Sequence, residues 1–234
     1  MIYRFSEIDS TNDYALRSKE TLVSGDVVIA SRQTKGHGRF NREWVSDSED
    51  NVYLTVVLGD ISNFSVIPLY TAVVLVRVLE SFGVNTKIKW PNDIFVDSKK
   101  IAGILVQSSL QGNNQFVVVG VGLNIRLSEE EKEKIGVPVV SLQEIGVNIV
   151  KDSFIEVFLD KFFIDLEKFT NQGFSFIKEE YEFNSSLTGK QINVKCSNKE
   201  FKGKVIGFSN TGEILIEENN QVIAMNSVEV LKVL

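Results

Sequence analysis

A basic, glycine-bearing stretch early in the chain has the composition of an anion-binding loop. Its glycines and cations are Lys35, Gly36, Gly38, Arg39 and Arg42. Glycines let backbone N–H groups turn toward an anion, and lysine or arginine then neutralises the charge. The stretch is not a dinucleotide fingerprint, because Asn41 stands where the last glycine would be, and it lacks the end of a Walker loop. It predicts a loop around a phosphate or carboxylate, or else a solvated basic turn.

A second candidate is the segment Lys89-Trp90-Pro91-Asn92-Asp93. Pro91 fixes its own φ angle, so Asn92 and Asp93 would be held in a defined direction. A carboxylate held in this way could bind Mg²⁺ or orient the reacting groups of a substrate. The alternative is a structural turn that carries an Asx motif.

Lys100 and a set of glycines form a third candidate. Lys100 precedes an apolar run that contains Gly103, and a later apolar run contains Gly120 and Gly122 ahead of Asn124. Glycine weakens a strand, so these positions indicate that a ligand or another group approaches the backbone there. A lysine at a strand end can face a pocket. The alternatives are a lysine that lies in solvent and a core strand in which the glycines only relieve crowding.

The composition narrows the chemistry further. The 234 residues include 25 basic and 31 acidic side chains, which gives a net charge of −6 and disfavours nucleic-acid binding through bulk charge. Cys196 and His37 are the single cysteine and the single histidine, which excludes an internal disulfide and a cysteine or histidine cluster for zinc. Any histidine-based nucleophilic catalysis would have to use His37.

The elements that would position these residues follow an α/β pattern. Ser10 caps a short helix that ends near Lys19, and Pro68 opens an apolar helix that Gly83 stops. Apolar and β-branched runs predict strands at 27–30, 53–58, 86–89, 94–96, 101–107 and 116–125. Apolar periodicity predicts further helices at 154–169 and 174–181.

The pattern changes near residue 185. From 185 to 234 five short alternating segments follow one another through polar connections, which is typical of a small β-barrel. We therefore expect a catalytic domain at 1–184, of α+β or α/β class, followed by a small β domain at 185–234. The acidic segment 128–135 is either a solvated helix or a mobile loop.

No part of the chain resembles a targeting signal. The N-terminus lacks an apolar signal core, and the longest uninterrupted apolar runs are much shorter than a membrane span. We therefore expect a cytoplasmic protein.

Five motifs, in this order, resemble the biotin–protein ligase family. They are Ser10-Thr11-Asn12, Gln33-x-x-Gly36-x-Gly38-Arg39-x-x-Arg42-x-Trp44, Lys89-Trp90-Pro91-Asn92-Asp93, Lys100-x-x-Gly103-Ile104-Leu105 and Gly120-x-Gly122-Leu123-Asn124-Ile125. The match is close over residues 8–125, and the C-terminal β segments resemble the family's SH3-like domain. The resemblance implies a catalytic domain built on a mixed, largely antiparallel sheet with flanking helices.

The resemblance also implies a role for each matching residue. Biotin would lie among Ser10, Thr11, Asn12, Gln33, His37, Gly38, Arg39, Trp90, Lys100 and Gly103. ATP and the adenylate would be bound by Arg39, Arg42, Trp44, Lys89, Asn92 and Asn124. Asp93, Lys100 and Arg39 would be catalytic, with Mg²⁺ arriving with ATP rather than held permanently, and residues 126–136 would order over the adenylate.

In that family, biotin's carboxylate attacks the α-phosphorus of MgATP to give biotinyl-5′-AMP and pyrophosphate. A lysine of a biotin carboxyl carrier protein then accepts the biotin. Neither step needs a protein nucleophile, which fits a chain with one histidine and one cysteine. The alternatives are a lipoate–protein ligase and a non-catalytic biotin sensor.

The remaining expectations concern partners and departures from the family pattern. Residues 1–10 leave no room for the DNA-binding module of some relatives, so we expect no DNA partner and no membrane, whereas a homodimer is compatible with the family. The family's loop usually reads Gly-Arg-Gly-Arg-x-Gly-Arg. Here His37 replaces its first arginine and Asn41 its last glycine, which changes how tightly the intermediate would be held.

Overall fold

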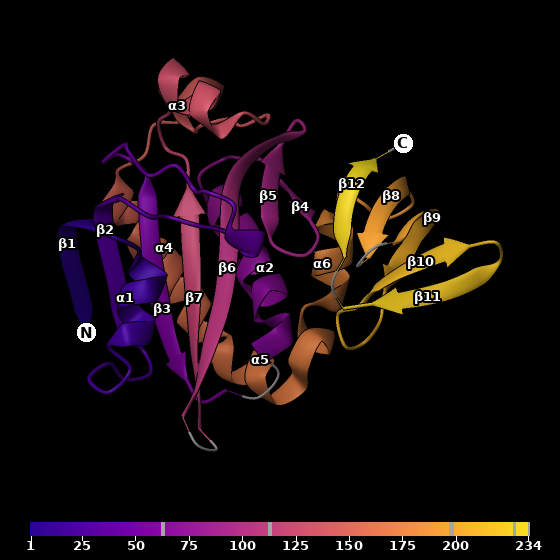
Figure 1. The fold of residues 1–234 in the computed structure, drawn as a ribbon, viewed down its shortest axis with the longest axis horizontal. Helices are drawn as coiled ribbons and strands as arrows, with labels where there is room; N and C mark the ends of the chain where they lie inside the picture. The colour runs from indigo at the N-terminus through magenta and orange to yellow at the C-terminus, as the bar shows by residue number, and fades with distance from the viewer. Residues whose placement is uncertain (62–63, 112–113, 197–198, 227, 234) are drawn as a thin grey trace.

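A seven-stranded mixed sheet forms the body of the molecule in the computed structural model, which describes residues 1–61, 64–111, 114–196, 199–226 and 228–233. Its strands, in spatial order, are β1 (Ile2–Ile8), β2 (Val27–Gln33), β3 (Val52–Gly59), β7 (Asn114–Leu123), β6 (Lys99–Gln111), β5 (Asp93–Val96) and β4 (Lys87–Lys89). Within this sheet β1 and β2 run parallel and the other neighbours are antiparallel (Figure 1). The predicted mixed, largely antiparallel sheet with flanking helices is confirmed.

Strand β1 is the element that the sequence analysis missed. Its residues alternate between exposed and half-buried at the edge of the sheet, so it lacks the apolar content that marked the other strands. Helix α1 (Thr11–Arg17) is the crossover between β1 and β2, a connection that parallel neighbours require. Ser10 caps α1 as expected, because its side chain accepts the backbone N–H of Asp13.

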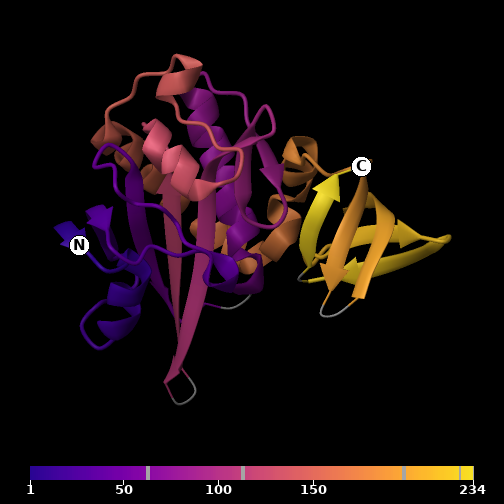
Figure 2. The ribbon, with the colours of Figure 1, turned by 45° about the horizontal axis from the view of Figure 1, so that its top comes forward.

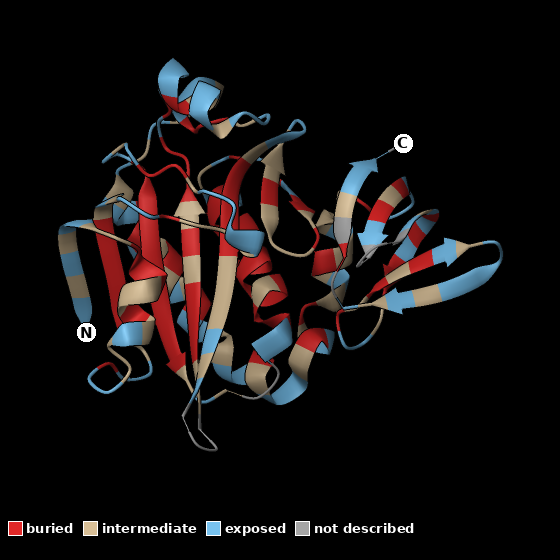
Figure 3. Cartoon of the chain, viewed as in Figure 1, coloured by how far each residue is buried: buried red, intermediate tan, exposed pale blue. Residues whose placement is uncertain are grey.

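Two hydrophobic cores lie on opposite faces of this sheet, because successive strand side chains point to opposite faces. On one face, Val28, Val57 and Val118 pack beneath Ala15 of α1. On the other face lies the main core, where helix α2 (Ile67–Ser81) packs on the sheet and α4 (Lys151–Ile164) packs on α2. Figure 3 shows the central strand β3 as almost continuously buried.

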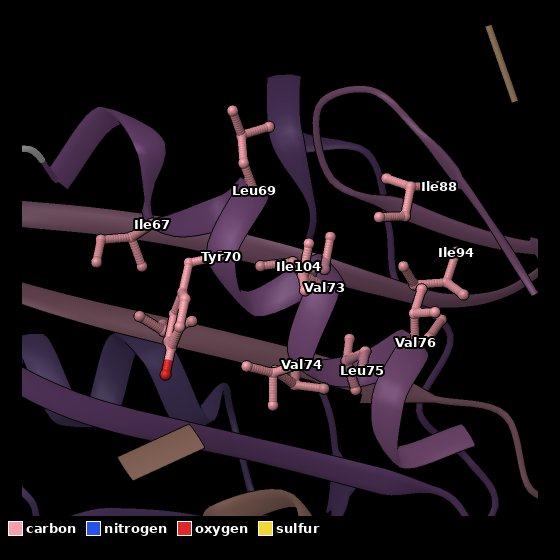
Figure 4. Close-up of a cluster of buried hydrophobic side chains, with 14 of the residues drawn as sticks. Ile67, Leu69, Tyr70, Val73, Val74, Leu75, Val76, Ile88, Ile94 and Ile104 are labelled. Carbon is pink, nitrogen blue, oxygen red and sulfur yellow. The ribbon is translucent and has the colours of Figure 1, made fainter. Parts of the chain in front are cut away.

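Helix α2 lies at the centre of the main core, where Figure 4 shows its apolar side chains beside Ile88, Ile94 and Ile104 of the sheet. The helix and the turn before it, Phe64–Ser81, are long and apolar enough to cross a membrane, with a mean hydropathy of 1.6. However, 67% of this stretch is buried within the fold, as in a core helix. The sequence analysis predicted this helix but counted only uninterrupted apolar runs, and Arg77 divides this one, so no stretch of membrane-spanning length was found.

The single helix expected at 154–169 is wrong, because the structure has two. Helix α4 ends at Ile164 and α5 spans Leu166–Gln172, with Asp165 between them. Asp165 accepts a hydrogen bond from Arg77 Nη1 at 2.9 Å, which anchors the break to α2. The helix expected at 174–181 is a 3-10 turn, Gly173–Phe176, followed by α6 (Lys178–Asn184). Apolar periodicity continues through both breaks and cannot reveal them.

The segment left open between helix and loop is a helix, α3 (Glu129–Ile135), beyond the upper end of the sheet in Figure 1. Ser128 and Glu131 form a capping box at its start, and a left-handed Gly136 ends it. Lys132 lies 2.6 Å from Glu144, in an ion pair that fastens α3 to the following segment.

The C-terminal part forms a second, antiparallel sheet, as expected for a small β module. Its strands, in spatial order, are β11 (Gln221–Met225), β10 (Ile214–Glu218), β9 (Lys199–Phe208), β8 (Gln191–Cys196) and β12 (Glu229–Val233). Figure 2 shows this sheet beside the main body, next to the helical segment that leads into it. The last residue of the expected domain, Leu234, lies outside the described residues.

Aromatic side chains join the two sheets. The rings of Phe174, Tyr181 and Phe208 pack edge to face across the junction. Trp90 Nε1 donates to the carbonyl of Gly212 at 3.3 Å, which ties the turn before β5 to the second sheet. The two sheets therefore share one continuous hydrophobic core.

Candidate active site

A large cavity of about 990 Å³ opens on the face of the main sheet that α1 covers only in part. Ligand pockets of enzymes commonly have this size. Every residue to which the family resemblance gave a binding or catalytic role lies on its wall: Ser10, Thr11, Asn12, Gln33, His37, Gly38, Arg39, Arg42, Trp44, Lys89, Trp90, Asn92, Asp93, Lys100, Gly103 and Asn124. The fold thus brings motifs that are far apart in the sequence to one place.

Strand glycines form the floor of this cavity. Gly103 of β6 pairs with Gly122 of β7, and Gly120 lies two residues earlier on the same face. A Cβ atom at Gly122 would lie 2.5 Å from the Trp44 indole, and one at Gly120 would lie 2.5 Å from the Asn12 side chain. The glycines therefore make room for side chains of this chain, and the indole occupies the space in front of Gly103 and Gly122.

One end of the cavity is polar and almost fully buried. Ser10, Thr11 and Asn12, at the start of α1, are only 3–4% exposed. Gln33, the last residue of β2, accepts the backbone N–H of Thr11 at 2.8 Å and donates to Ser46 Oγ at 3.0 Å. These groups are fixed by protein partners before any ligand arrives, which is the arrangement that selective binding requires.

Two polar residues behind this end were missed by the sequence analysis. Thr55 of β3 is fully buried, and its Oγ1 lies 2.8 Å from Thr11 Oγ1 and 2.7 Å from Asn12 Oδ1. Gln107 of β6 accepts a hydrogen bond from Asn12 Nδ2 at 2.8 Å. Thr55 stands opposite Gly120 in the sheet, a pairing that is visible only once the strand register is known.

Opposite charges meet farther along the wall. Lys100 Nζ lies 2.7 Å from Asp93 Oδ1 and 4.9 Å from the centre of the Trp44 ring. The side chains of Lys100 and Asp93 are 23% and 25% exposed, so solvent and ligands can reach the pair. A ligand anion at this point would meet an ammonium group that a carboxylate holds in position.

Asn92 joins these charges to the glycine-bearing loop. Its Oδ1 accepts a hydrogen bond from Arg39 Nη1 at 3.4 Å, and its Nδ2 donates to the Ile104 carbonyl at 2.8 Å. The wall also carries Lys89 and Arg42, so several cations surround the cavity in a chain of net charge −6. Local positive charge of this kind suits phosphate or carboxylate ligands.

The glycine-bearing loop is folded into a tight hairpin, with an isolated bridge between His37 and Glu43 and a 3-10 turn, Arg39–Asn41, at its tip. Phe40 and Asn41 adopt left-handed φ angles of 59° and 55°. Asparagine tolerates this conformation better than most residues other than glycine. This explains how Asn41 can stand where the resembling family has a glycine.

The two glycines of the loop, Gly36 and Gly38, have different surroundings. A Cβ atom at Gly36 would lie 2.6 Å from Ser46 Oγ, so packing requires the glycine. At Gly38 the nearest atom would be 3.7 Å away, and the Gly38 N–H donates to the Arg42 carbonyl at 2.7 Å. In this conformation, anion binding at the loop depends on its cations rather than on the N–H of Gly38.

The segment after β7, residues 126–139, borders the cavity and is attached to it at both ends. At its start, the buried side chain of Asn51 accepts two backbone N–H groups, of Ile125 and the next residue, at 2.7 and 2.8 Å. At its end, the backbone of Lys100 exchanges hydrogen bonds of 3.0 Å with Pro138 and Val140. The position of this segment and that of Lys100 are therefore linked, and Asn51 is a further residue that motif reading missed.

Two expected site residues are also committed to the fold. The Asn124 side chain donates from Nδ2 to the Val140 carbonyl at 3.4 Å, and the Trp90 indole N–H donates to the Gly212 carbonyl. The second sheet adds β12 residues to the wall, among them Lys232. The C-terminal module therefore supplies part of the cavity, which no motif indicated.

Known proteins resemble this chain in sequence. A family model described as the Biotin/lipoate A/B protein ligase family matches residues 5–124. The bifunctional ligase/repressor BirA of Escherichia coli (strain K12) is 29% identical over 218 residues, covering 91% of this chain and 68% of the relative. The biotin–[acetyl-CoA-carboxylase] ligase of Paracoccus denitrificans is 28% identical over 218 residues, covering 89% of this chain and 90% of the relative.

A solved biotin protein ligase also resembles this chain in fold. The biotin protein ligase from Aquifex aeolicus, solved in complex with biotin and ATP, matches with a TM-score of 0.83 at 26% identity, covering 98% of each chain. The likeness therefore includes the second sheet as well as the region of the motifs. Because the family model matches more than half of the residues of this chain, the chain belongs to the biotin/lipoate A/B protein ligase family, as its motifs predicted.

Proposed function

We propose that this chain is a biotin–protein ligase. Biotin's carboxylate oxygen would attack the α-phosphorus of ATP, forming biotinyl-5′-AMP and releasing pyrophosphate. The amine of a lysine on a biotin carboxyl carrier protein would then attack the acyl carbon, forming an amide and releasing AMP. The observation that carries the proposal is one cavity that joins a buried, hydrogen-bonded polar end to a cation-lined end.

The two ends suit the two parts of such a substrate. The neutral head group of biotin would occupy the end at Thr11, Asn12 and Gln33, and its carboxylate would lie toward Lys100. The reaction brings a carboxylate and a phosphate together against their repulsion, and Lys100 with Arg39 would offset that repulsion. Positioning and electrostatic stabilisation supply the catalysis, because both nucleophiles come from substrates.

Mg²⁺ fits this wall as a partner of the nucleotide. Among the residues that the structure describes, no group of three or more His, Cys, Asp or Glu side chains could hold a metal by itself. Mg²⁺ is usually bound by one or two carboxylates together with substrate phosphates and waters, and Asp93 offers such a carboxylate on the wall. When bound, the ion would neutralise phosphate charge.

The test is the exchange of labelled pyrophosphate into ATP, measured with biotin, with lipoate and with neither. Exchange that requires biotin supports the proposal. Exchange that requires lipoate would make the chain a lipoate–protein ligase, and biotin binding without any exchange would make it a sensor. Transfer of labelled biotin to a carrier domain then tests the second step.

The C-terminal module would support binding of ATP or of the acceptor protein. We propose that it is an SH3-like domain that begins near residue 185, and the β12 residues on the cavity wall support this role. The cytoplasmic location, the lack of a DNA partner and the homodimer stay predictions.

A further inference from the structure

We propose that Thr55, which does not reach the cavity, positions the hydrogen-bonding groups at its buried polar end; this inference rests on the proposed biotin ligase function. Thr55 is 0% exposed and lies directly behind Thr11 and Asn12, both of which line the cavity. Its role follows from where the hydrogen atoms of this network must lie.

The amide of Asn12 can point in one direction only. Its Nδ2 lies 3.2 Å from the Leu105 carbonyl and 2.8 Å from Gln107 Oε1, and a carbonyl oxygen can only accept. The other amide atom, Oδ1, therefore faces Thr55 Oγ1 at 2.7 Å. Because Oδ1 is also only an acceptor, the Thr55 hydroxyl is the donor in this contact.

Thr55 Oγ1 is also placed to donate to Thr11 Oγ1 at 2.8 Å, so its single hydrogen is shared between Thr11 and Asn12. Thr11 Oγ1 donates its own hydrogen to Gln33 Oε1 at 3.1 Å, the same atom that accepts the Thr11 backbone N–H. The hydrogen of the Thr11 hydroxyl therefore points to a protein acceptor, and its oxygen offers the cavity an acceptor and no donor.

This polarity restricts the ligand. A group that fits here has to bring an N–H or O–H donor, as the cyclic urea of biotin does, whereas the dithiolane ring of lipoate has none. A buried site built around a hydrogen bond rejects an analogue that cannot form it, because the site's own group is left unpaired. Thr55 would thus help to select biotin over lipoate without touching either molecule.

The test is Thr55→Val, which keeps the shape of the side chain and removes the hydroxyl. We expect the biotin Kd, measured by calorimetry, to rise about tenfold or more, with a matching rise in the KM for biotin. The KM for ATP and kcat at saturating biotin should stay within about twofold, since Thr55 is remote from the charged groups that would meet the reacting atoms. Thr55→Ser should restore wild-type affinity.

Thr71→Val is the matched control. Thr71 is also 0% exposed, but its hydroxyl donates to the Ile67 carbonyl within α2. It should bind biotin as the wild type does, even if it loses similar thermal stability. Equal losses of affinity in Thr71→Val and Thr55→Val would overturn the inference, because they would indicate a general packing effect.

A double variant separates positioning from packing at the site itself. If Thr55 acts through Thr11, then Thr11→Val combined with Thr55→Val should weaken biotin binding by much less than the product of the single effects. Independent effects, or wild-type affinity in Thr55→Val, would overturn the inference, and Thr55→Ala replaces the valine variant if that does not fold. Failure of the wild-type chain to bind biotin would instead overturn the proposed function.

Discussion

At the polar end of the cavity, Thr11 and Asn12 are buried and form hydrogen bonds with half-buried Gln33 and with Thr55. At the charged end, the side chains of Asp93 and Lys100 are about a quarter exposed. Hydrogen bonds fixed in advance select a neutral group by its donors and acceptors. Charges that remain accessible can instead bind anions that differ in shape, as a carboxylate and a phosphate do. The comparison indicates that selectivity and charge stabilisation come from different parts of one wall.

The supporting structure differs in the same way. The polar end rests on α1 and on the centre of the sheet, through Asn12 over Gly120 and Thr55 behind it. At the charged end, Asp93 and Lys100 also lie on strands, β5 and β6, but the wall around them includes the hairpin around Arg39 and residues 126–139, which lie outside the regular sheet. Sites on strands and helices are held more firmly than sites on loops.

Lys100→Gln should have the largest effect, because it removes the cation between two anions and keeps the length of the side chain. We expect pyrophosphate exchange to fall about 100-fold to 1,000-fold, with the biotin Kd changed far less. Lys99→Gln, at the exposed neighbouring position, is the control. Near-normal exchange in Lys100→Gln would contradict the assignment of charge stabilisation to this end of the cavity.

Gln33→Leu tests the other end. It removes the acceptor of the Thr11 N–H and the donor to Ser46, and should weaken biotin binding about 10-fold to 100-fold through unpaired buried groups. Binding of ATP alone, measured by calorimetry, should stay within about twofold. If ATP binding fell as much as biotin binding, the two ends would not be independent.

Asp93→Asn should lower kcat about tenfold, because the neutral amide holds the Lys100 ammonium less firmly and no longer offers a carboxylate to Mg²⁺. Single-turnover formation of the adenylate measures this effect, and Asp97→Asn in the β5–β6 turn is the control. A large drop in the thermal midpoint of Asp93→Asn, with normal turnover in what remains folded, would instead identify Asp93 as a structural turn residue.

Asn51→Ala should release the start of residues 126–139, because it removes the acceptor of two backbone N–H groups. We expect tryptic cleavage within that segment to be several-fold faster and preformed biotinyl-AMP to dissociate a few-fold faster. Asn51→Asp keeps an acceptor at this place and should lie between Asn51→Ala and the wild type. Unchanged cleavage in Asn51→Ala would mean that other contacts hold the segment.

The smallest effect should come from the pH dependence of Glu144, which pairs with Lys132 of α3. Burial acts to raise the pKa of Glu144, but hydrogen bonds from Lys132 and Ser141 outweigh it, and the pKa is lowered. Glu144 therefore stabilises the fold above the ordinary carboxyl pKa, and this contribution is lost as the pH falls through the lowered value. Glu144→Gln should lower the thermal midpoint by about 1–2 °C at pH 6 and by less at pH 4. Equal shifts of the thermal midpoint at the two pH values would contradict this prediction.

The sequence determined most of the elements and the membership of the site. Alternating or continuous apolar runs identified the buried strands, and capping residues such as Ser10 and the stop at Gly83 set helix ends. These signals are local, because they depend on the backbone preferences and side-chain pattern of neighbouring residues. Most of the motif residues line one cavity.

Only the tertiary structure decided what depends on contacts between distant residues. Strand β1 exists because β2 provides its hydrogen-bonding partner, and α4 ends where Asp165 meets Arg77. Thr55 and Asn51 are ordinary residues in the sequence, and they become part of the site through partners more than forty residues away. Local pattern cannot report such pairings, because the energy of a buried hydrogen bond depends on the partner that the fold brings to it.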